Sequence, residues 1–154
     1  MPTSTSRLAP ALLSAFVILG LSGCATDSPP EQSVRLQKAA GMTAFQIETT
    51  KSLWETTTAT HNVTDPEIKG KVTPLDNGLQ KVELDGVTLA NYLRRLDYDA
   101  HGGAGEYPWS RERRPESIRM YDEIAKVIYG MKEEPAPGDP PPLVIVGDAV
   151  IDTK

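Results

Sequence analysis

The chain has 154 residues, of which 39% are hydrophobic, 24% charged and 6% aromatic, and its formal charge is −5. These values describe one small globular domain with additional segments, and they exclude a coiled coil, a collagen-like repeat and a disulfide scaffold. The single cysteine cannot form an internal disulfide or a cysteine-rich zinc site. Nucleic acid is not an expected partner, because phosphate binding requires a basic surface.

Residues 1–23 have the composition of a secretory signal peptide. A short polar start carries one charge, Arg7, and precedes the apolar run Leu8–Leu21. As a helix this run spans about 21 Å, which is shorter than the hydrocarbon core of a bilayer, about 30 Å. A charged start, a short apolar core and a small-residue exit indicate a cleaved leader rather than a transmembrane anchor.

The leader ends in the motif Leu21-Ser22-Gly23-Cys24. This motif resembles the lipobox of bacterial lipoproteins, in which a branched residue and two small residues precede an obligatory cysteine. The resemblance implies that Cys24 becomes the mature N-terminus, its sulfur carrying diacylglycerol and its amine a fatty acid such as palmitate. It also implies a place in the cell envelope, lipid-anchored on the non-cytoplasmic side. Ala25, where an aspartate would favour retention in the inner membrane, favours the outer membrane in a host with two membranes.

Beyond the leader, residues 24–40 are expected to be the lipidated N-terminus and a disordered tether, and residues 41–154 a small α+β domain. The start of the tether is rich in Ser, Thr, Pro and acidic residues and has too few apolar residues to order itself. Between residues 34 and 60 the pattern favours a helix early and a strand late, since the threonines at 56–58 and 60 favour extended backbone.

The middle of the chain predicts a hairpin. Two extended runs, Ile68–Leu75 and Leu79–Leu84, flank the turn Asp76-Asn77-Gly78. Asn-Gly is a strong hairpin signal, because both residues tolerate positive φ. Pro74 cannot donate to a ladder, so the first strand is expected at an edge of the sheet.

Two amphipathic helices follow the hairpin. The first is expected to begin at an N-cap, Thr88, and to end at Gly102-Gly103, with Leu89, Tyr92, Leu93 and Leu96 inward and Asn91, Arg94, Arg95 and Asp97 outward. The second begins at Pro115 and ends at Gly130, with Ile118, Tyr121, Ile124, Ala125 and Ile128 on its apolar face.

The C-terminal part predicts a proline-rich spacer at 134–142 and then a buried strand, Leu143–Val146. Gly147-Asp148 resembles a turn, and residues 149–151 are a candidate return strand. The predicted fold is therefore α+β: a small sheet, made of the central hairpin and the C-terminal strand, packs with two amphipathic helices.

The connection between the two helices contains the candidate partner-binding residues. It is longer than most helix connections and carries Tyr107, Trp109, Arg111, Arg113 and Arg114. Tyr, Trp and Arg are enriched at interface hot spots, and long loops in compact domains are often functional. An alternative is that the aromatic residues fold back and cap the small core. The favoured function is a non-enzymatic interaction module with an envelope protein as its partner and no cofactor or metal.

A second hypothesis is a small metal-dependent or hydrolytic envelope enzyme. Asp97, Asp99 and His101 alternate at the end of the first predicted helix. Carboxylates with an imidazole are able to bind a divalent metal or to act as acid and base when the fold brings them together.

Overall fold

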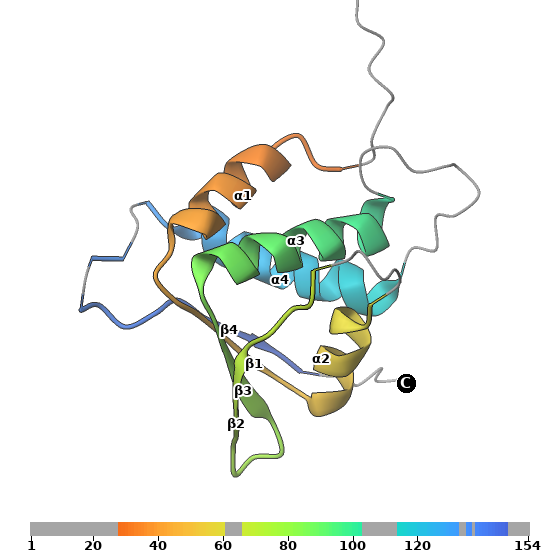
Figure 1. The fold of residues 1–154 in the computed structure, drawn as a ribbon, viewed down its shortest axis with the longest axis vertical. Coiled ribbons are helices and arrows are strands. Elements are labelled where there is room, and N and C mark those ends of the chain that lie inside the picture. The colour runs from red at the N-terminus through yellow and green to blue at the C-terminus, as the bar shows by residue number, and fades with distance from the viewer. Residues whose placement is uncertain (1–27, 61–65, 103–113, 133–134, 137, 148–154) are drawn as a thin grey trace, which may run out of the picture.

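The computed structural model describes residues 28–60, 66–102, 114–132, 135–136 and 138–147 (Figure 1). Within these ranges the chain forms four helices and four strands, an α+β fold as predicted. In chain order they are α1 (Gln32–Gly41), β1 (Phe45–Thr49), α2 (Lys51–Thr58), β2 (Lys71–Pro74), β3 (Gln80–Leu84), α3 (Gly86–His101), α4 (Pro115–Gly130) and β4 (Leu143–Val146). None of the helices in the described ranges combines the length and apolarity needed to cross a membrane.

The strands form one mixed sheet in the order β2-β3-β1-β4. β1 is antiparallel to β3 and parallel to β4, so that Ile47 lies between Val82 and Val144. The predicted β2–β3 hairpin is confirmed, and Gly78 in its turn has a φ of 80°. The strand β1 separates the hairpin from the C-terminal strand, a position that no local pattern specifies.

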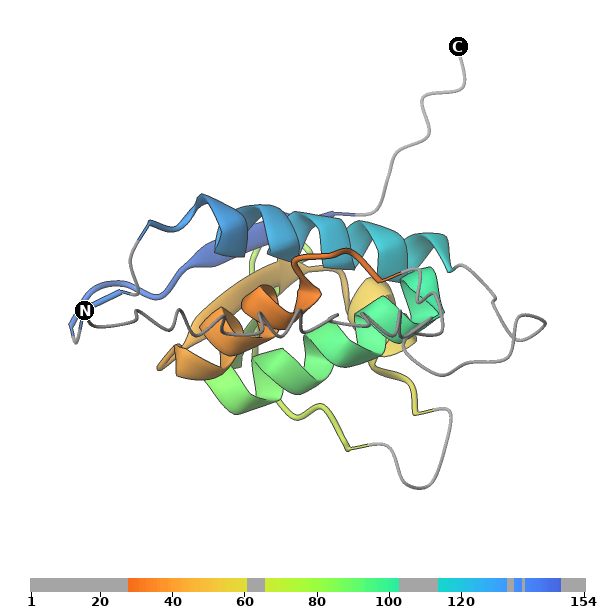
Figure 2. The same cartoon turned by 90° about the horizontal axis from the view of Figure 1, so that it is seen from above.

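One face of the sheet carries the core. Alternate residues of the strands are buried on this face, among them Phe45, Ile47, Val82, Leu84, Val144 and Val146. α3 and α4 lie over it, and α1 packs on these helices from the side away from the strands (Figures 1 and 2). The apolar stripes predicted for α3 and α4 face this core, with Tyr92, Leu93, Tyr121 and Ile124 at most 1% exposed.

The helix α1 occupies most of the segment expected to be a disordered tether. Leu36, Ala39 and Met42 recur at helical spacing and pack against the core, and Ala39 is fully buried. The closest approach is at Gly86, where an added Cβ would lie 2.4 Å from the carbonyl oxygen of Met42 and 2.6 Å from that of Ala39. Residues 32–40 thus belong to the folded domain, so the predicted tether extends too far, whereas the helix favoured early in the region 34–60 is present.

The threonine-rich run at 51–58 is the helix α2, where extended backbone was expected. The Thr50 side chain caps the helix by accepting a hydrogen bond from the Leu53 amide at 3.2 Å. Inside the helix the Thr57 hydroxyl donates to the Leu53 carbonyl at 2.8 Å and the Thr58 hydroxyl to the Trp54 carbonyl at 2.7 Å. Burial of Leu53 and Trp54 outweighs the weak strand preference of threonine.

The helix α3 differs from the prediction at its start and on its outer face. Asp85, rather than Thr88, is the N-cap, because its Oδ1 accepts a hydrogen bond from the Thr88 amide at 2.7 Å. Arg95 and Asp97, expected to face solvent, are 8% and 6% exposed. The predicted stop is confirmed, since Gly102 has a φ of 84° and ends the helix in the left-handed conformation.

The C-terminal strand β4 joins the sheet as predicted, but as an edge strand with one covered face. Val144 and Val146 are buried, whereas Leu143 and Ile145 are 42% and 60% exposed on the open face. The opposite edge, β2, contains Lys71 and Pro74, residue types that discourage further pairing. The candidate return strand at 149–151 lies outside the described residues.

Candidate functional site

Most residues of the predicted partner-binding loop lie outside the described part of the chain. This holds for Tyr107, Trp109, Arg111 and Arg113, and also for the lipobox cysteine, Cys24. Arg114 is described: it precedes α4, and its amide donates a 3.2 Å hydrogen bond to the carbonyl of Asp99. The two ends of the segment 103–113 are therefore held together at the C-terminal end of α3.

A cluster of three polar residues, Ser28, Asp97 and His101, lies at this same end of α3. The Ser28 hydroxyl donates a 2.6 Å hydrogen bond to Oδ2 of Asp97. The other carboxylate oxygen, Oδ1, lies 2.9 Å from Nδ1 of His101, one helical turn further on. Asp97 is 6% exposed. The hydrogen-bond partners of its two oxygens offset the cost of removing a carboxylate from water.

Tyr121 of α4 closes this cluster from the side. Its ring meets the His101 imidazole edge-on, with 5.1 Å between centroids and 78° between planes. Its hydroxyl donates to Oε1 of Gln32 and accepts from Nη1 of Arg35 at 3.0 Å. Burial raises the pKa of the Tyr121 hydroxyl, and the Arg35 hydrogen bond partly opposes that shift. The start of α1 is thus held on α4 by polar contacts.

Asp99 faces a different set of partners from Asp97. Its Oδ2 lies 3.5 Å from the Ser117 hydroxyl at the start of α4, and it is 6% exposed. Since α3 turns by about 100° per residue, two positions separate Asp97 and Asp99 onto different flanks of the helix. Among the residues that the structure describes, no group of three His, Cys, Asp or Glu side chains is arranged to hold a metal ion.

The Asp97–His101 pair has one element of a hydrolytic site, a carboxylate that orients an imidazole. A nucleophile would have to lie within hydrogen-bond reach of the second imidazole nitrogen. The Ser28 hydroxyl is directed to the carboxylate of Asp97 instead. The described geometry therefore holds the N-terminal segment in place and does not activate Ser28.

A second cluster of buried polar side chains lies between α2 and α3 and includes Arg95. The Arg95 guanidinium donates to the carbonyls of Thr58 at 2.7 Å and Pro66 at 2.6 Å. The hydroxyls of Tyr92 and Thr57 share a 2.6 Å hydrogen bond, and the Tyr92 ring lies 5.2 Å from that of Trp54. Burial raises the pKa of Tyr92 far above its ordinary value of 10.0, while the Thr57 hydrogen bond acts in the opposite direction.

An open groove of about 370 Å³ runs between the start of α1 and the outer side of α4; we call it the α1–α4 groove. It is lined by two tyrosines, two basic residues, two acidic residues, a proline and an alanine: Tyr121, Tyr129, Arg35, Lys126, Glu31, Asp122, Pro29 and Ala125. Tyr129 is 73% exposed. Sequence patterns did not predict this groove, because three of its eight lining residues come from the segment expected to be a tether.

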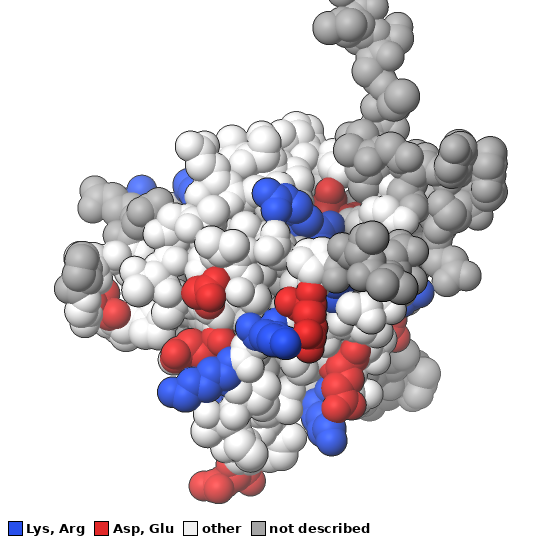
Figure 3. All heavy atoms as spheres, in the orientation of Figure 1, with Lys and Arg blue, Asp and Glu red and all other residues white. Residues whose placement is uncertain are grey.

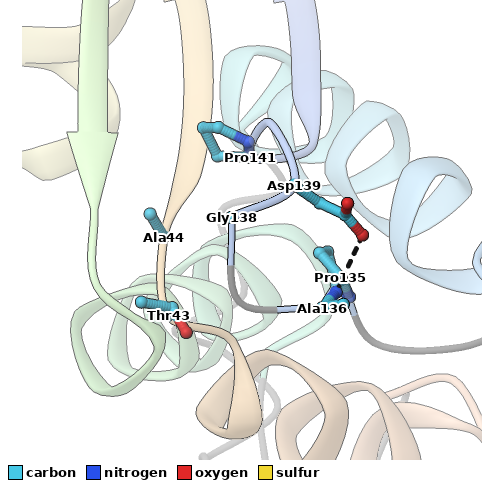
Figure 4. Close-up of a pocket in the computed structure, with 7 residues that line it drawn as sticks. All are labelled: Thr43, Ala44, Pro135, Ala136, Gly138, Asp139 and Pro141. Carbon is cyan, nitrogen blue, oxygen red and sulfur yellow. Dashed lines mark hydrogen bonds between the residues drawn. The ribbon is translucent and has the colours of Figure 1, made fainter.

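A smaller pocket of about 100 Å³ lies where the proline-rich spacer passes the residues before β1 (Figure 4). Thr43 and Ala44 form one side, and the other side is formed by Pro135, Ala136, Gly138, Asp139 and Pro141. The Asp139 carboxylate accepts a 2.9 Å hydrogen bond from the Ala136 amide. Pockets that bind small molecules are usually three times this volume or larger. This pocket is therefore too small for a typical small-molecule site.

Charged side chains of both signs alternate over the face shown in Figure 3. On the sheet, Lys81 lies 3.6 Å from Glu48, and the Gln46 amide donates to Glu83 at 3.0 Å. Such a mixed surface gives no continuous basic area on this face.

Comparison of the chain with protein-family models, with curated proteins and with solved structures gives no match.

Proposed function

We propose that this chain is a lipid-anchored protein of the bacterial cell envelope whose domain is a non-enzymatic interaction module. The proposal rests on the lipobox motif that ends at Cys24, and the hydrogen bond from Ser28 to the buried carboxylate of Asp97 fixes the start of the domain close to it. Ser28 lies four positions after the lipobox cysteine, Cys24. Four residues span at most about 14 Å, so the folded domain begins close to the acylated residue.

Acylation of Cys24 supplies the membrane attachment in this proposal. Each buried CH₂ group contributes about 0.8 kcal/mol, so two or three acyl chains make the anchor effectively permanent. The described residues contain no membrane-spanning helix, and the lipid is the proposed contact with the bilayer. The proposed location is the non-cytoplasmic side of the envelope, with the outer membrane favoured in a host with two membranes.

An envelope protein is the proposed partner of the domain. The candidate contact residues Tyr107, Trp109, Arg111 and Arg113 belong to the segment delimited by Gly102 and Arg114. These two residues lie beside the Ser28–Asp97–His101 cluster, because Gly102 follows His101 and the Arg114 amide bonds to Asp99. The segment thus leaves and re-enters the domain at the end where the anchor arrives.

The enzymatic alternative has less support from the described residues. Asp97 and His101 are paired, but Asp99 has other partners and Ser28 bonds to the carboxylate rather than to the imidazole. Neither the α1–α4 groove nor the spacer pocket is lined by His101. An interaction role requires none of these groups to react.

The test of the anchor is the intact mass of the full chain isolated from membranes, beside a Cys24→Ser variant. The expected result is a mature chain that starts at Cys24 with added acyl mass, and a variant that keeps its leader and carries no acyl mass. An unmodified Cys24 in the parent chain would overturn the proposal.

The test of the interaction role is capture of envelope proteins by the acylated chain and by its Trp109→Ala variant. Loss of one defined partner, with an unchanged circular dichroism spectrum, is the expected result. Val87→Ala is the matched control, because Val87 is 65% exposed on α3. Unfolding of the Trp109 variant would instead show that the ring caps the core, and would contradict the assignment of the loop.

A further inference from the structure

The place where the chain enters the domain determines which surface faces the bilayer. If Cys24 is acylated, as proposed above, its backbone lies at the membrane surface, and Ser28 lies within about 14 Å of it. The α1–α4 groove begins at Pro29 and Glu31, one and three positions after Ser28. The groove therefore begins next to the first described residue of the chain, Ser28.

The arrangement of the layers agrees with this orientation. Residues 28–31 run along the helix side of the domain, and the β2–β3 hairpin projects from the opposite side (Figure 1). α1 lies outermost on the helix side, packed on α3 and α4 (Figures 1 and 2). A bilayer reached through Ser28 therefore meets α1 and the outer side of α4, while the hairpin points away from it.

The side chains of the groove suit the headgroup region of a membrane. Tyrosine and basic side chains are favoured there, because their apolar parts contact acyl chains while their polar ends stay in water. Tyr129 is largely exposed on the rim, beside Lys126. Glu123 lies beside the groove, 2.6 Å from Lys126, so this surface carries three acidic and two basic side chains. The excess of acidic residues disfavours an anionic headgroup and favours one with a charge of each sign.

Arg35 adds a polar group at the bottom of this groove. Its side chain is 16% exposed and stacks on the Tyr121 ring at 5.7 Å. Its Nη1 donates to the Tyr121 hydroxyl at 3.0 Å, whereas its Nη2 has its nearest carboxylate oxygen, on Glu31, 3.7 Å away. A phosphate oxygen is a stronger acceptor for a guanidinium than the distant Glu31 contact allows.

We propose that the α1–α4 groove is the membrane-facing surface of this protein and holds the headgroup of a zwitterionic phospholipid. Arg35 and Lys126 contact the phosphate, and Glu31 and Asp122 contact the ammonium group. The acyl anchor supplies the affinity for the membrane. Because the anchor already holds the chain at the bilayer, binding of a headgroup by the groove is an intramolecular step, and it sets the orientation of the domain.

The test uses the full acylated chain in phosphatidylethanolamine vesicles that contain a lipid with a nitroxide on its headgroup. A fluorophore is attached at Tyr129→Cys, in the groove, or at Thr73→Cys, on the exposed strand β2. Acylated Cys24 has no free thiol to label. We expect several-fold stronger quenching at position 129 than at position 73. Equal quenching, or stronger quenching at 73, would overturn the assignment of the face.

A charge reversal tests the headgroup contact itself. Lys126→Glu should weaken the quenching of the probe at 129, whereas the matched reversal Lys69→Glu should leave it unchanged, because Lys69 lies outside the groove and is 75% exposed. No difference between the two variants would overturn the phosphate contact. The acyl mass of the same sample separates the two proposals: an acylated chain with an unquenched groove contradicts this inference alone, and a chain without acyl mass contradicts both.

Discussion

The Ser28 hydroxyl donates a 2.6 Å hydrogen bond to the Asp97 carboxylate, although the two residues are 69 positions apart in the chain. The same carboxylate holds His101 at 2.9 Å. One buried acidic residue thus fixes both the first described residue of the domain and the last turn of α3.

Asp97→Ala is expected to reduce the free energy of unfolding by about 1–3 kcal/mol, because it leaves two polar partners unpaired in a buried place. Asp76→Ala, in the exposed hairpin turn, is the control and should change stability by about 0.5 kcal/mol or less. Urea unfolding followed by circular dichroism measures both values. Equal effects would show that the Asp97 contacts contribute nothing to folding.

Gly86→Ala should destabilise the domain more than an ordinary glycine substitution. The new Cβ would lie 2.4 Å from the Met42 carbonyl oxygen and 2.6 Å from that of Ala39, so α1 and α3 must separate. A loss of about 1–3 kcal/mol is expected for such overpacking. Gly130→Ala is the matched control, since nothing lies within 4 Å of its Cβ position. A Gly86 variant as stable as the Gly130 variant would disprove the close contact between the helices.

Alkaline pH should destabilise the protein through Tyr92. Its pKa is raised above the ordinary value of 10.0 by burial, so above pH 10 the unfolded chain loses this proton while the folded chain retains it. The unfolded state then binds fewer protons, and stability falls as pH rises, by up to about 1.4 kcal/mol per pH unit for one such group. Tyr121, whose pKa is also raised, adds to the same slope.

The Tyr92→Phe variant separates these contributions. Its stability at neutral pH should fall by about 1 kcal/mol, since it loses the hydrogen bond with Thr57. Between pH 10 and 12 its unfolding free energy should decline less steeply than that of the parent chain. Identical slopes in guanidinium titrations at several pH values would contradict the shifted pKa.

Removal of divalent metal should leave the thermal unfolding midpoint unchanged. A bound metal stabilises the folded state by mass action, so a chelator would lower the midpoint of a metalloprotein. The described residues offer no group of three ligands, and Asp99 faces Ser117 rather than His101. A midpoint that falls with chelator and recovers with zinc or magnesium, and that does neither in a His101→Ala variant, would restore the metal-enzyme hypothesis.

Local patterns predicted the elements whose structure depends on nearby residues. The hairpin follows from the Asn77-Gly78 turn, and the ends of α3 and α4 follow from Gly102 and Pro115. The helix α2 did not follow from its threonines, because burial of Leu53 and Trp54 against distant residues decides its conformation. The position of β1 in the sheet likewise depends on pairings with β3 and β4, which are far away in the sequence.

The candidate site was predicted in part. His101 and Asp97 were identified, but as members of an outward-facing helix end. The buried carboxylate of Asp97 has Ser28 as a partner, which lies 69 positions earlier in the chain. Arg95 likewise has distant partners, the carbonyls of Thr58 and Pro66. Neither partner can be read from the periodicity of α3.

The parallel pairing of β1 with β4 links the order of synthesis to the order of folding. β1 is made early, yet its neighbour on one side is the last described strand of the chain, and Val144 and Val146 complete the buried face. The core cannot be finished until the chain has emerged from the ribosome as far as Val146. For a chain that crosses a membrane behind a signal peptide, as proposed here, this sheet therefore stays incomplete while the residues before β4 are being translocated.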